Sequence, residues 1–183
     1  VFTVMDMIPE HYPEVSSPDQ LASRAQLFER ADRLVAISEA TRDALVELFP
    51  ATADKVVVIR VPVAEEPLTD LAVPEPSRYY VYVGKRQSYK DFSTAVAALA
   101  LVPHDISLVV VGGGPLEAEF VQQAERLGVT DRLVAEPAPD DDRLAHLLAG
   151  SSGLVSTSLE EGFGLPPLEA LQAGTRAIIA ETP

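Results

Sequence analysis

The 183-residue chain carries 28 acidic and 14 basic side chains, so its formal net charge is −14 and its isoelectric point lies near 4.5. This charge argues against a nucleic-acid binder, because affinity for a phosphate backbone needs a cationic face. The absence of cysteine excludes disulfides, thiolate nucleophiles and thiolate metal sites. Hydrophobic residues make up 47% of the chain, which is enough to bury a core. No apolar run of about 18 residues and no signal-like leader occurs, so we expect neither a membrane span nor a signal peptide.

The first 63 residues alternate between strand-like and helix-like segments. An apolar opening stopped by Pro9 predicts a buried strand that delivers Asp6 and a turn at Ile8-Pro9-Glu10 to its carboxyl end. Apolar residues at helical spacing after Pro18, and a capping serine at position 38, predict two helices. In chain order we expect a strand over residues 1–8, a helix over 17–31, a strand over 33–37, a helix from 38 to about 49 and a strand over 55–63.

The middle of the chain changes character. Four prolines spaced among acidic residues over residues 61–77 predict an extended linker, which we place at residues 64–77. Beyond it we expect strands over residues 79–83, 107–111, 132–136 and 153–158 and a last strand-like run near the end, with helices over 91–101, 116–127 and 140–149 and one from 165. This alternation predicts parallel βαβ units in two α/β domains, residues 1–63 and 78–183. The chain opens in one strand and closes soon after another, so we expect both domains to be incomplete.

A cation-bearing loop follows the strand predicted over residues 79–83. Lys85, Arg86 and Lys90 fall within six residues, in a chain with only 14 lysines and arginines. Ligands of open α/β sheets bind at the carboxyl ends of strands, so this loop, which opens at Gly84, is a candidate anion site. An ordinary solvated loop is the alternative, because charged residues are mostly exposed.

Two other stretches have sufficient structural explanations. Residues 111–117 contain three successive glycines, but a dinucleotide fingerprint would need a further glycine where Glu117 stands. We therefore favour a flexible strand-to-helix turn. Ser38 is expected to cap a helix and Glu39 to favour its positive end, so a ligand role for this pair would be an addition.

The most informative stretch is the turn that follows residues 153–158. A helix should begin near Leu165, because the prolines at 166 and 167 are tolerated only in a first helical turn. The unpaired N–H groups and positive dipole end of such a helix favour phosphate, and two glycines within residues 161–164 allow close approach. Glu169 lies roughly 6 Å further along the axis, at ~1.5 Å per residue. Solvated carboxylates flanking a tight turn are the alternative.

Metal and nucleophile schemes find little support in the sequence. The three histidines have no paired-ligand spacing, and no GxSxG elbow occurs. Glu161 and Glu169 have the residue types of a hydrolase pair, but the cation-bearing loop and the helix start indicate a phosphorylated leaving group. We therefore expect group transfer without a metal.

At this point the motifs resemble a known family. Residues 161–169 look like the glutamate-x7-glutamate signature of the retaining GT-B glycosyltransferases of family 4, also called glycosyl transferases group 1. Shorter motifs follow in that family's order: Asp6–Glu10 resembles its HD-x-x-P strand end, Ser38–Arg42 its S-E-x-T-R segment, Gly84–Lys90 its G-x-R-x-x-x-K donor loop and Val111–Pro115 its VGxGP turn.

The resemblance implies an α/β fold of GT-B type, with an acceptor-side Rossmann-like domain (1–63) and a donor-side one (78–183). It implies a hexosyltransferase-type enzyme (EC 2.4) of polysaccharide biosynthesis that moves a sugar from a nucleotide sugar to a sugar, lipid-linked or other acceptor, with retention of configuration. It implies no cofactor, no metal and a cytoplasmic location, with peripheral contact at the inner face of a membrane as an alternative.

The same resemblance assigns roles to individual residues. Arg86 and Lys90 would hold the diphosphate, Glu169 would accept from the ribose hydroxyls, and Glu161 would contact the donor sugar. The implied donor-binding residues are Gly84, Arg86, Lys90, Gly162, Phe163, Gly164, Leu165 and Glu169, and the implied catalytic residues are Glu161 and Asp6.

The chain departs from the family pattern in two respects. Met5 stands where the family has a histidine before the aspartate, and the chain is shorter than such enzymes. Two alternatives therefore stay open beside the transferase: a sugar-nucleotide epimerase of the same fold, and a non-catalytic fragment that binds a nucleotide sugar.

Overall fold

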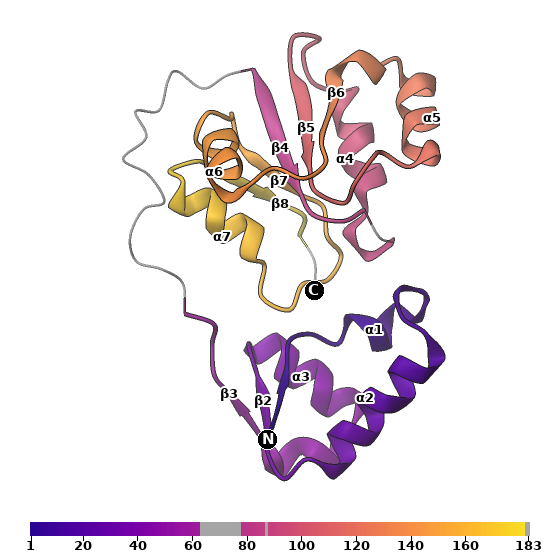
Figure 1. Ribbon diagram of the computed structural model, residues 1–183, viewed down its shortest axis with the longest axis vertical. Coiled ribbons are helices and arrows are strands. Elements are labelled where there is room, and N and C mark those ends of the chain that lie inside the picture. Colours follow the sequence, from indigo (N-terminus) through magenta and orange to yellow (C-terminus); the bar gives the residue numbers. More distant parts are fainter. Residues whose placement is uncertain (63–77, 87, 182–183) are drawn as a thin grey trace. The chain divides into compact units, whose positions relative to one another are not determined.

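The computed structural model describes residues 1–62, 78–86 and 88–181 of the chain, and Figure 1 shows the elements they form. Contacts divide the chain into two compact units. The first unit comprises Val1–Val63 with Glu160–Gly164, and the second comprises Ala64–Leu159 with Leu165–Pro183. The linker predicted over residues 64–77 lies outside the described residues. Each unit has its own parallel sheet and its own core.

The first unit is a three-stranded parallel sheet with helices. Its strands are β1 (Phe2–Val4), β2 (Leu34–Ala36) and β3 (Val56–Val58), in the order β1-β2-β3. Its helices are α1 (Ile8–His11), α2 (Pro18–Arg30) and α3 (Glu39–Leu48). The core consists of Val4, Met7, Phe28, Leu34 and Leu45.

The helix starts of this unit follow from its sequence. Ser17 caps α2 in a complete capping box with Gln20, and the Ser38 hydroxyl caps α3 by accepting the Thr41 N–H at 3.0 Å.

Two strands of the first unit are shorter than the sequence predicts. The first ends at Val4, because residues 8–11 form a helix whose proline fits its first turn. The third covers only Val56–Val58, because a 3-10 helix takes residue 55 and the pairing partner β2 ends at Ala36, opposite Val58.

The second unit is built on a five-stranded parallel sheet. Its strands are β4 (Tyr79–Val83), β5 (Ser107–Val111), β6 (Leu133–Glu136), β7 (Leu154–Ser156) and β8 (Ala177–Ile179), in the order β6-β5-β4-β7-β8. Its helices are α4 (Phe92–Leu99), α5 (Ala118–Leu127), α6 (Asp141–Ala149) and α7 (Leu165–Gln172). The predicted β/α alternation of this half is confirmed.

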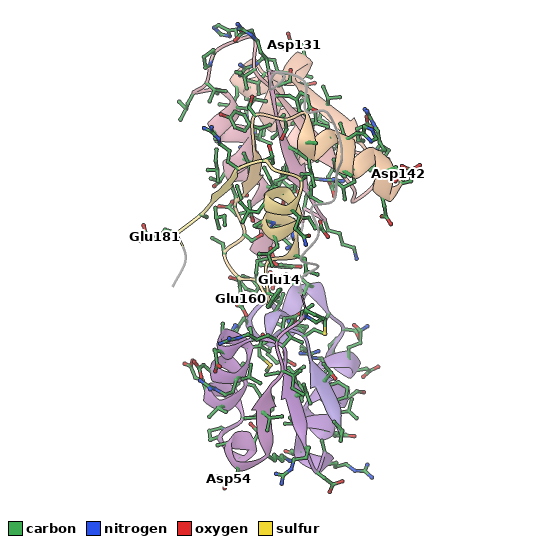
Figure 2. The ribbon with its side chains drawn as sticks, turned by 90° about the vertical axis from the view of Figure 1, so that its left-hand side faces the viewer. Glu14, Asp54, Asp131, Asp142, Glu160 and Glu181 are labelled. Carbon is green, nitrogen blue, oxygen red and sulfur yellow. The ribbon has the colours of Figure 1, made fainter. Side chains whose placement is uncertain are left out.

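Both faces of this sheet are covered by helices, as Figure 1 shows. Successive strand residues point to opposite faces. Tyr82 packs into a core with residues of α4 and α5, while its neighbour Val81 packs into a second core with residues of α6 and α7. The acidic side chains of Asp131 and Asp142, labelled in Figure 2, lie at the surface of this unit.

The strand order creates a switch point in the sheet. From β4 the chain winds outward to β5 and β6, and then returns to β7 and β8 on the other side. Ligands of open α/β sheets bind outside the carboxyl ends of the strands at such a reversal. The loops after β4 and β7 flank it. Within the part of the chain that the structure describes, no helix has both the length and the apolar character needed to cross a membrane.

Candidate active site

The loop between β4 and α4 is held in place by side-chain hydroxyls. The Tyr82 hydroxyl reaches the carbonyl oxygens of Lys85 and Lys90, at 3.3 and 3.5 Å. The Thr157 hydroxyl, directly after the end of β7, donates to the same Lys90 carbonyl at 3.0 Å. The loop opens at Gly84, whose φ of 133° suits glycine. These contacts fix the loop at the switch point of the sheet.

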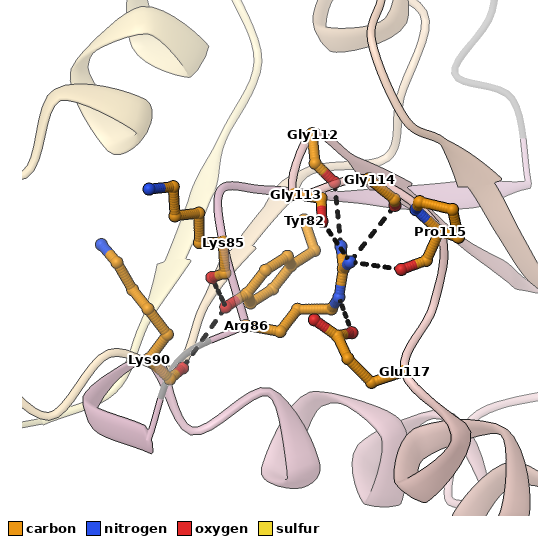
Figure 3. A network of polar contacts seen from close by, with 9 residues as sticks. All are labelled: Tyr82, Lys85, Arg86, Lys90, Gly112, Gly113, Gly114, Pro115 and Glu117. Carbon is orange, nitrogen blue, oxygen red and sulfur yellow. Dashed lines mark hydrogen bonds and ion pairs between the residues drawn. The ribbon is translucent and has the colours of Figure 1, made fainter. Parts of the chain in front are cut away.

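Arg86, predicted to bind a diphosphate, has a fully buried side chain with protein partners. Its Nε donates to Oε2 of Glu117 at 2.5 Å. Its terminal nitrogens donate to the carbonyl oxygens of residues 112–115, at 2.8, 2.9, 3.2 and 2.9 Å in chain order (Figure 3). Its Cζ also lies 5.9 Å from the ring centroid of Phe92. The guanidinium therefore binds the glycine turn after β5.

Glu117 is the carboxylate that pairs with this buried guanidinium. Partial burial raises the pKa of Glu117, but the hydrogen bond and charge of Arg86 outweigh that effect, so the pKa is lowered overall. Glu117 therefore remains ionised well below neutral pH. Sequence reasoning missed this role, because it considered the position only as a glycine lacking from a dinucleotide fingerprint.

The two lysines of the loop lie apart from this cluster. Figure 3 shows the side chains of Lys85 and Lys90 on the opposite side of Tyr82 from the Arg86 guanidinium. Lys85 is exposed, and Lys90 is half-buried with its Nζ 5.1 Å from the Tyr89 ring centroid. The loop thus presents lysine charge on one side and uses its arginine on the other.

Helix α7 begins at Leu165, where the sequence predicts it. Residues 166 and 167 are prolines without N–H groups, so the donors of this helix start are the neighbouring backbone amides. Glu169 lies in the same helix and is half-buried. Burial, followed by repulsion from Asp141, raises the pKa of Glu169. A half-buried carboxylate that is costly to ionise is typical of a functional position.

In the first unit, Asp6 follows the end of β1. Arg24 donates to the Asp6 carbonyl at 2.8 Å and forms two hydrogen bonds with the Glu10 carboxylate, at 2.7 and 3.0 Å. Burial raises the pKa of the Asp6 carboxyl, against the lowering charge of Arg24 and N–H of Ile8, and the charges of Glu10 and Glu161 raise it further. The structure therefore brings two predicted catalytic carboxylates, Asp6 and Glu161, within electrostatic reach.

Segment Glu160–Gly164 belongs by its contacts to the first unit. The Ser38 hydroxyl donates to the Gly162 carbonyl at 2.7 Å, and Glu160 lies 2.7 Å from Nδ1 of His11. A Cβ at Gly162 would overlap the Met5 carbonyl oxygen, so only glycine fits there. Ser38 thus has a tertiary contact beyond the helix cap that the sequence predicts.

Within the described ranges, no three His, Asp and Glu side chains cluster closely enough to hold a metal ion. The expectation that no metal or cofactor takes part stays a prediction.

Comparison with known proteins adds the family. Residues 65–183 match the model of the family described as "Glycosyl transferases group 1". The chain belongs to this family. It is 27% identical over 193 residues to a D-inositol 3-phosphate glycosyltransferase of Xylanimonas cellulosilytica, with 95% of this chain and 46% of the relative covered. It is 24% identical over 185 residues to the O-antigen chain mannosyltransferase RfbU of Salmonella typhimurium, with 99% of this chain and 52% of the relative covered. The chain thus spans about half the length of these relatives.

Solved structures agree on the fold. Anabaena Alr3699/HepE, in complex with UDP and glucose, superposes with a TM-score of 0.76 at 22% identity, over 99% of this chain and 52% of that one. Sucrose-phosphate synthase from Thermosynechococcus elongatus gives a TM-score of 0.75 at 23% identity, over 98% of this chain and 49% of that one. These neighbours and the two parallel sheets establish the α/β fold of GT-B type.

Proposed function

We propose that this glycosyl transferases group 1 protein transfers a hexose from a nucleotide sugar to an acceptor, with retention of anomeric configuration. Family membership supports transferase chemistry, and the names of the curated relatives support a glycosyl group as the one transferred. One observation carries the donor assignment: the lysine-bearing loop after β4 is held by the hydroxyls of Tyr82 in β4 and of Thr157 directly after β7. This is the switch point where open α/β sheets bind ligands.

The proposed roles follow from the charges of the second unit. Lys90 and the start of α7 supply a cation and backbone N–H groups, which stabilise the negative charge that develops on a leaving diphosphate. Fixed donors of this kind do so without a metal. Glu169 accepts hydrogen bonds from the ribose hydroxyls, since its half-buried carboxylate is stabilised by such donors. Gly84 leaves the backbone of the loop open to the donor.

The remaining predicted residues belong to the sugar and acceptor side of the proposal. We assign Glu161 to the donor sugar, with Gly162 and Phe163 lining its approach. We assign Asp6 to the acceptor, because it follows the carboxyl end of β1, and its raised pKa suits uptake of a proton. Sugars and lipid-linked sugars are the acceptor classes to test, and the cytoplasm, including the inner face of a membrane, is the location to test by fractionation.

Isothermal titration calorimetry tests the donor site. UDP is the first probe, followed by GDP and ADP and then by their sugar conjugates. We expect Glu169→Ala and Lys90→Ala each to weaken binding about tenfold or more, because a hydrogen bond to a charged group contributes about 1.5–3 kcal/mol. Glu125→Ala and Arg126→Ala remove the same charges from exposed positions of α5, and should change the affinity by less than about twofold.

Two results would contradict the proposal. Unchanged nucleotide affinity in both site variants would refute the site, and a nucleotide-binding protein that neither transfers nor hydrolyses any sugar conjugate would be a binding protein only. An epimer formed without acceptor would identify an epimerase. The anomeric proton coupling of the product, measured by NMR, decides between retention and inversion.

A further inference from the structure

The glycine turn after β5 has a backbone that needs a cation. Gly112, Gly113 and Gly114 have φ values of 80°, 72° and 78°, so three successive residues are left-handed. Their carbonyl oxygens and that of Pro115 converge on the single guanidinium of Arg86. Four partially negative oxygens facing one point repel one another unless a positive group lies between them. The shape of the turn therefore depends on Arg86.

Gly113 shows how closely the guanidinium is fitted to this turn. A Cβ added there would lie 2.7 Å from Nη1, 3.0 Å from Cζ and 3.1 Å from Nη2 of Arg86. At Gly114 the same addition would meet nothing within 4 Å. The turn thus forms a cradle for the arginine, while Phe92 lies against the guanidinium from the core of the unit.

The cradle joins the loops of two neighbouring strands. Arg86 comes from the loop after β4, and the turn follows β5, which pairs with β4 along its whole length. The guanidinium nitrogens of Arg86 bind Glu117 and the four carbonyl oxygens. Figure 3 shows Lys85 and Lys90 across Tyr82, away from the cradle. A ligand at this edge would meet a surface whose shape Arg86 sets.

We propose that Arg86 is a positioning residue for the donor and not one of its ligands. The pair Arg86–Glu117 holds the turn after β5 against the loop after β4, and so presents Lys90 and the backbone of both loops to the nucleotide diphosphate. This inference rests on the proposed function, because it concerns the binding of a nucleotide sugar. It differs from the sequence prediction, in which the Arg86 charge itself holds the diphosphate.

Glu117 separates the two roles. If Arg86 bound the diphosphate, removing the competing carboxylate would leave its charge more available, so Glu117→Gln would bind UDP as well as or better than wild type. If Arg86 positions the turn, Glu117→Gln loosens the guanidinium and weakens binding. A purely structural pair would lower the melting temperature without changing the UDP affinity of the folded protein.

Calorimetric titration of the full-length protein with UDP, well below its melting temperature, measures this difference. We expect Glu117→Gln to weaken the binding of UDP about threefold or more, since a charge-assisted hydrogen bond is roughly twice as strong as a neutral one. Arg86→Lys should weaken it about tenfold, because a lysine ammonium cannot reproduce the planar fork of donors. Glu119→Gln, which removes an exposed carboxylate from the first turn of α5, should change the affinity less than about twofold.

The double variant Arg86→Lys with Glu117→Gln completes the cycle. Residues that act as one unit give non-additive losses, so the double variant should bind UDP about as weakly as Arg86→Lys alone. Additive losses, or a Glu117→Gln protein that binds UDP at least as tightly as wild type, would overturn the positioning role. A folded wild-type protein that binds none of UDP, GDP and ADP would overturn the proposed function, and this inference with it.

Discussion

Two alanine substitutions in the glycine turn test the arginine cradle directly. Gly113→Ala and Gly114→Ala both place a Cβ on a left-handed residue, with φ of 72° and 78°, which costs about 1–2 kcal/mol in either case. They differ in their surroundings, because the first Cβ would lie 2.7 Å from Nη1 of Arg86 and the second in open space. Gly114→Ala is therefore a matched control for the backbone cost.

The difference between the two variants measures the contact with the guanidinium. At 2.7 Å the guanidinium of Arg86 has to move, which weakens one or more bonds to carbonyls, each contributing about 1.5–3 kcal/mol as a charged hydrogen bond. We expect Gly113→Ala to lower the free energy of unfolding by about 3–5 kcal/mol, and Gly114→Ala by about 1–2 kcal/mol. For a unit of this size the melting temperatures should differ by roughly 10 °C.

Differential scanning calorimetry and urea unfolding followed by circular dichroism measure these quantities. The extra cost of Gly113→Ala should disappear in an Arg86→Ala background, because no guanidinium remains to be displaced. If the two alanine variants unfold within about 0.5 kcal/mol of each other, the guanidinium does not lie in the turn and the reasoning is refuted.

Two further predictions concern other parts of the site. Burial raises the pKa of Glu169, so its ionised carboxylate destabilises the folded protein at a pH above that raised pKa. Glu169→Gln should therefore raise the melting temperature at pH 7 and give no such gain below the ordinary pKa of 4.5. An equal gain at both pH values would contradict the raised pKa. Ser38→Ala removes a helix cap and the bond to the Gly162 carbonyl, whereas Ser17→Ala removes only a cap. In urea unfolding, Ser38→Ala should lower the free energy of unfolding by about 1 kcal/mol more than Ser17→Ala does. Equal losses would mean that the hydrogen bond to the Gly162 carbonyl contributes nothing to stability.

The sequence by itself determined the local structure of most of this chain. Serine before α2 and α3 marks a helix start because its hydroxyl satisfies an N–H group that the first turn leaves unpaired. Proline at the start of α2, and the two prolines after Leu165, mark helix starts because they lack such an N–H group. The valine-rich runs between them become parallel strands, since βαβ units bury both faces of a sheet. The resemblance of the motifs to a known family then predicted a fold of GT-B type.

Tertiary structure decided which partners the predicted site residues contact. Arg86 meets partners 26 to 31 positions away, and Ser38 meets a carbonyl 124 positions away. Such partners depend on which strands become neighbours and on how loops approach, and neither appears in local spacing. The sequence predicted that Arg86 lies in the loop after β4. Only the structure shows that its guanidinium is buried and bound by four carbonyl oxygens of the glycine turn. A motif fixes the position of a charge along the chain, but the fold selects its partner, because burying that charge requires one.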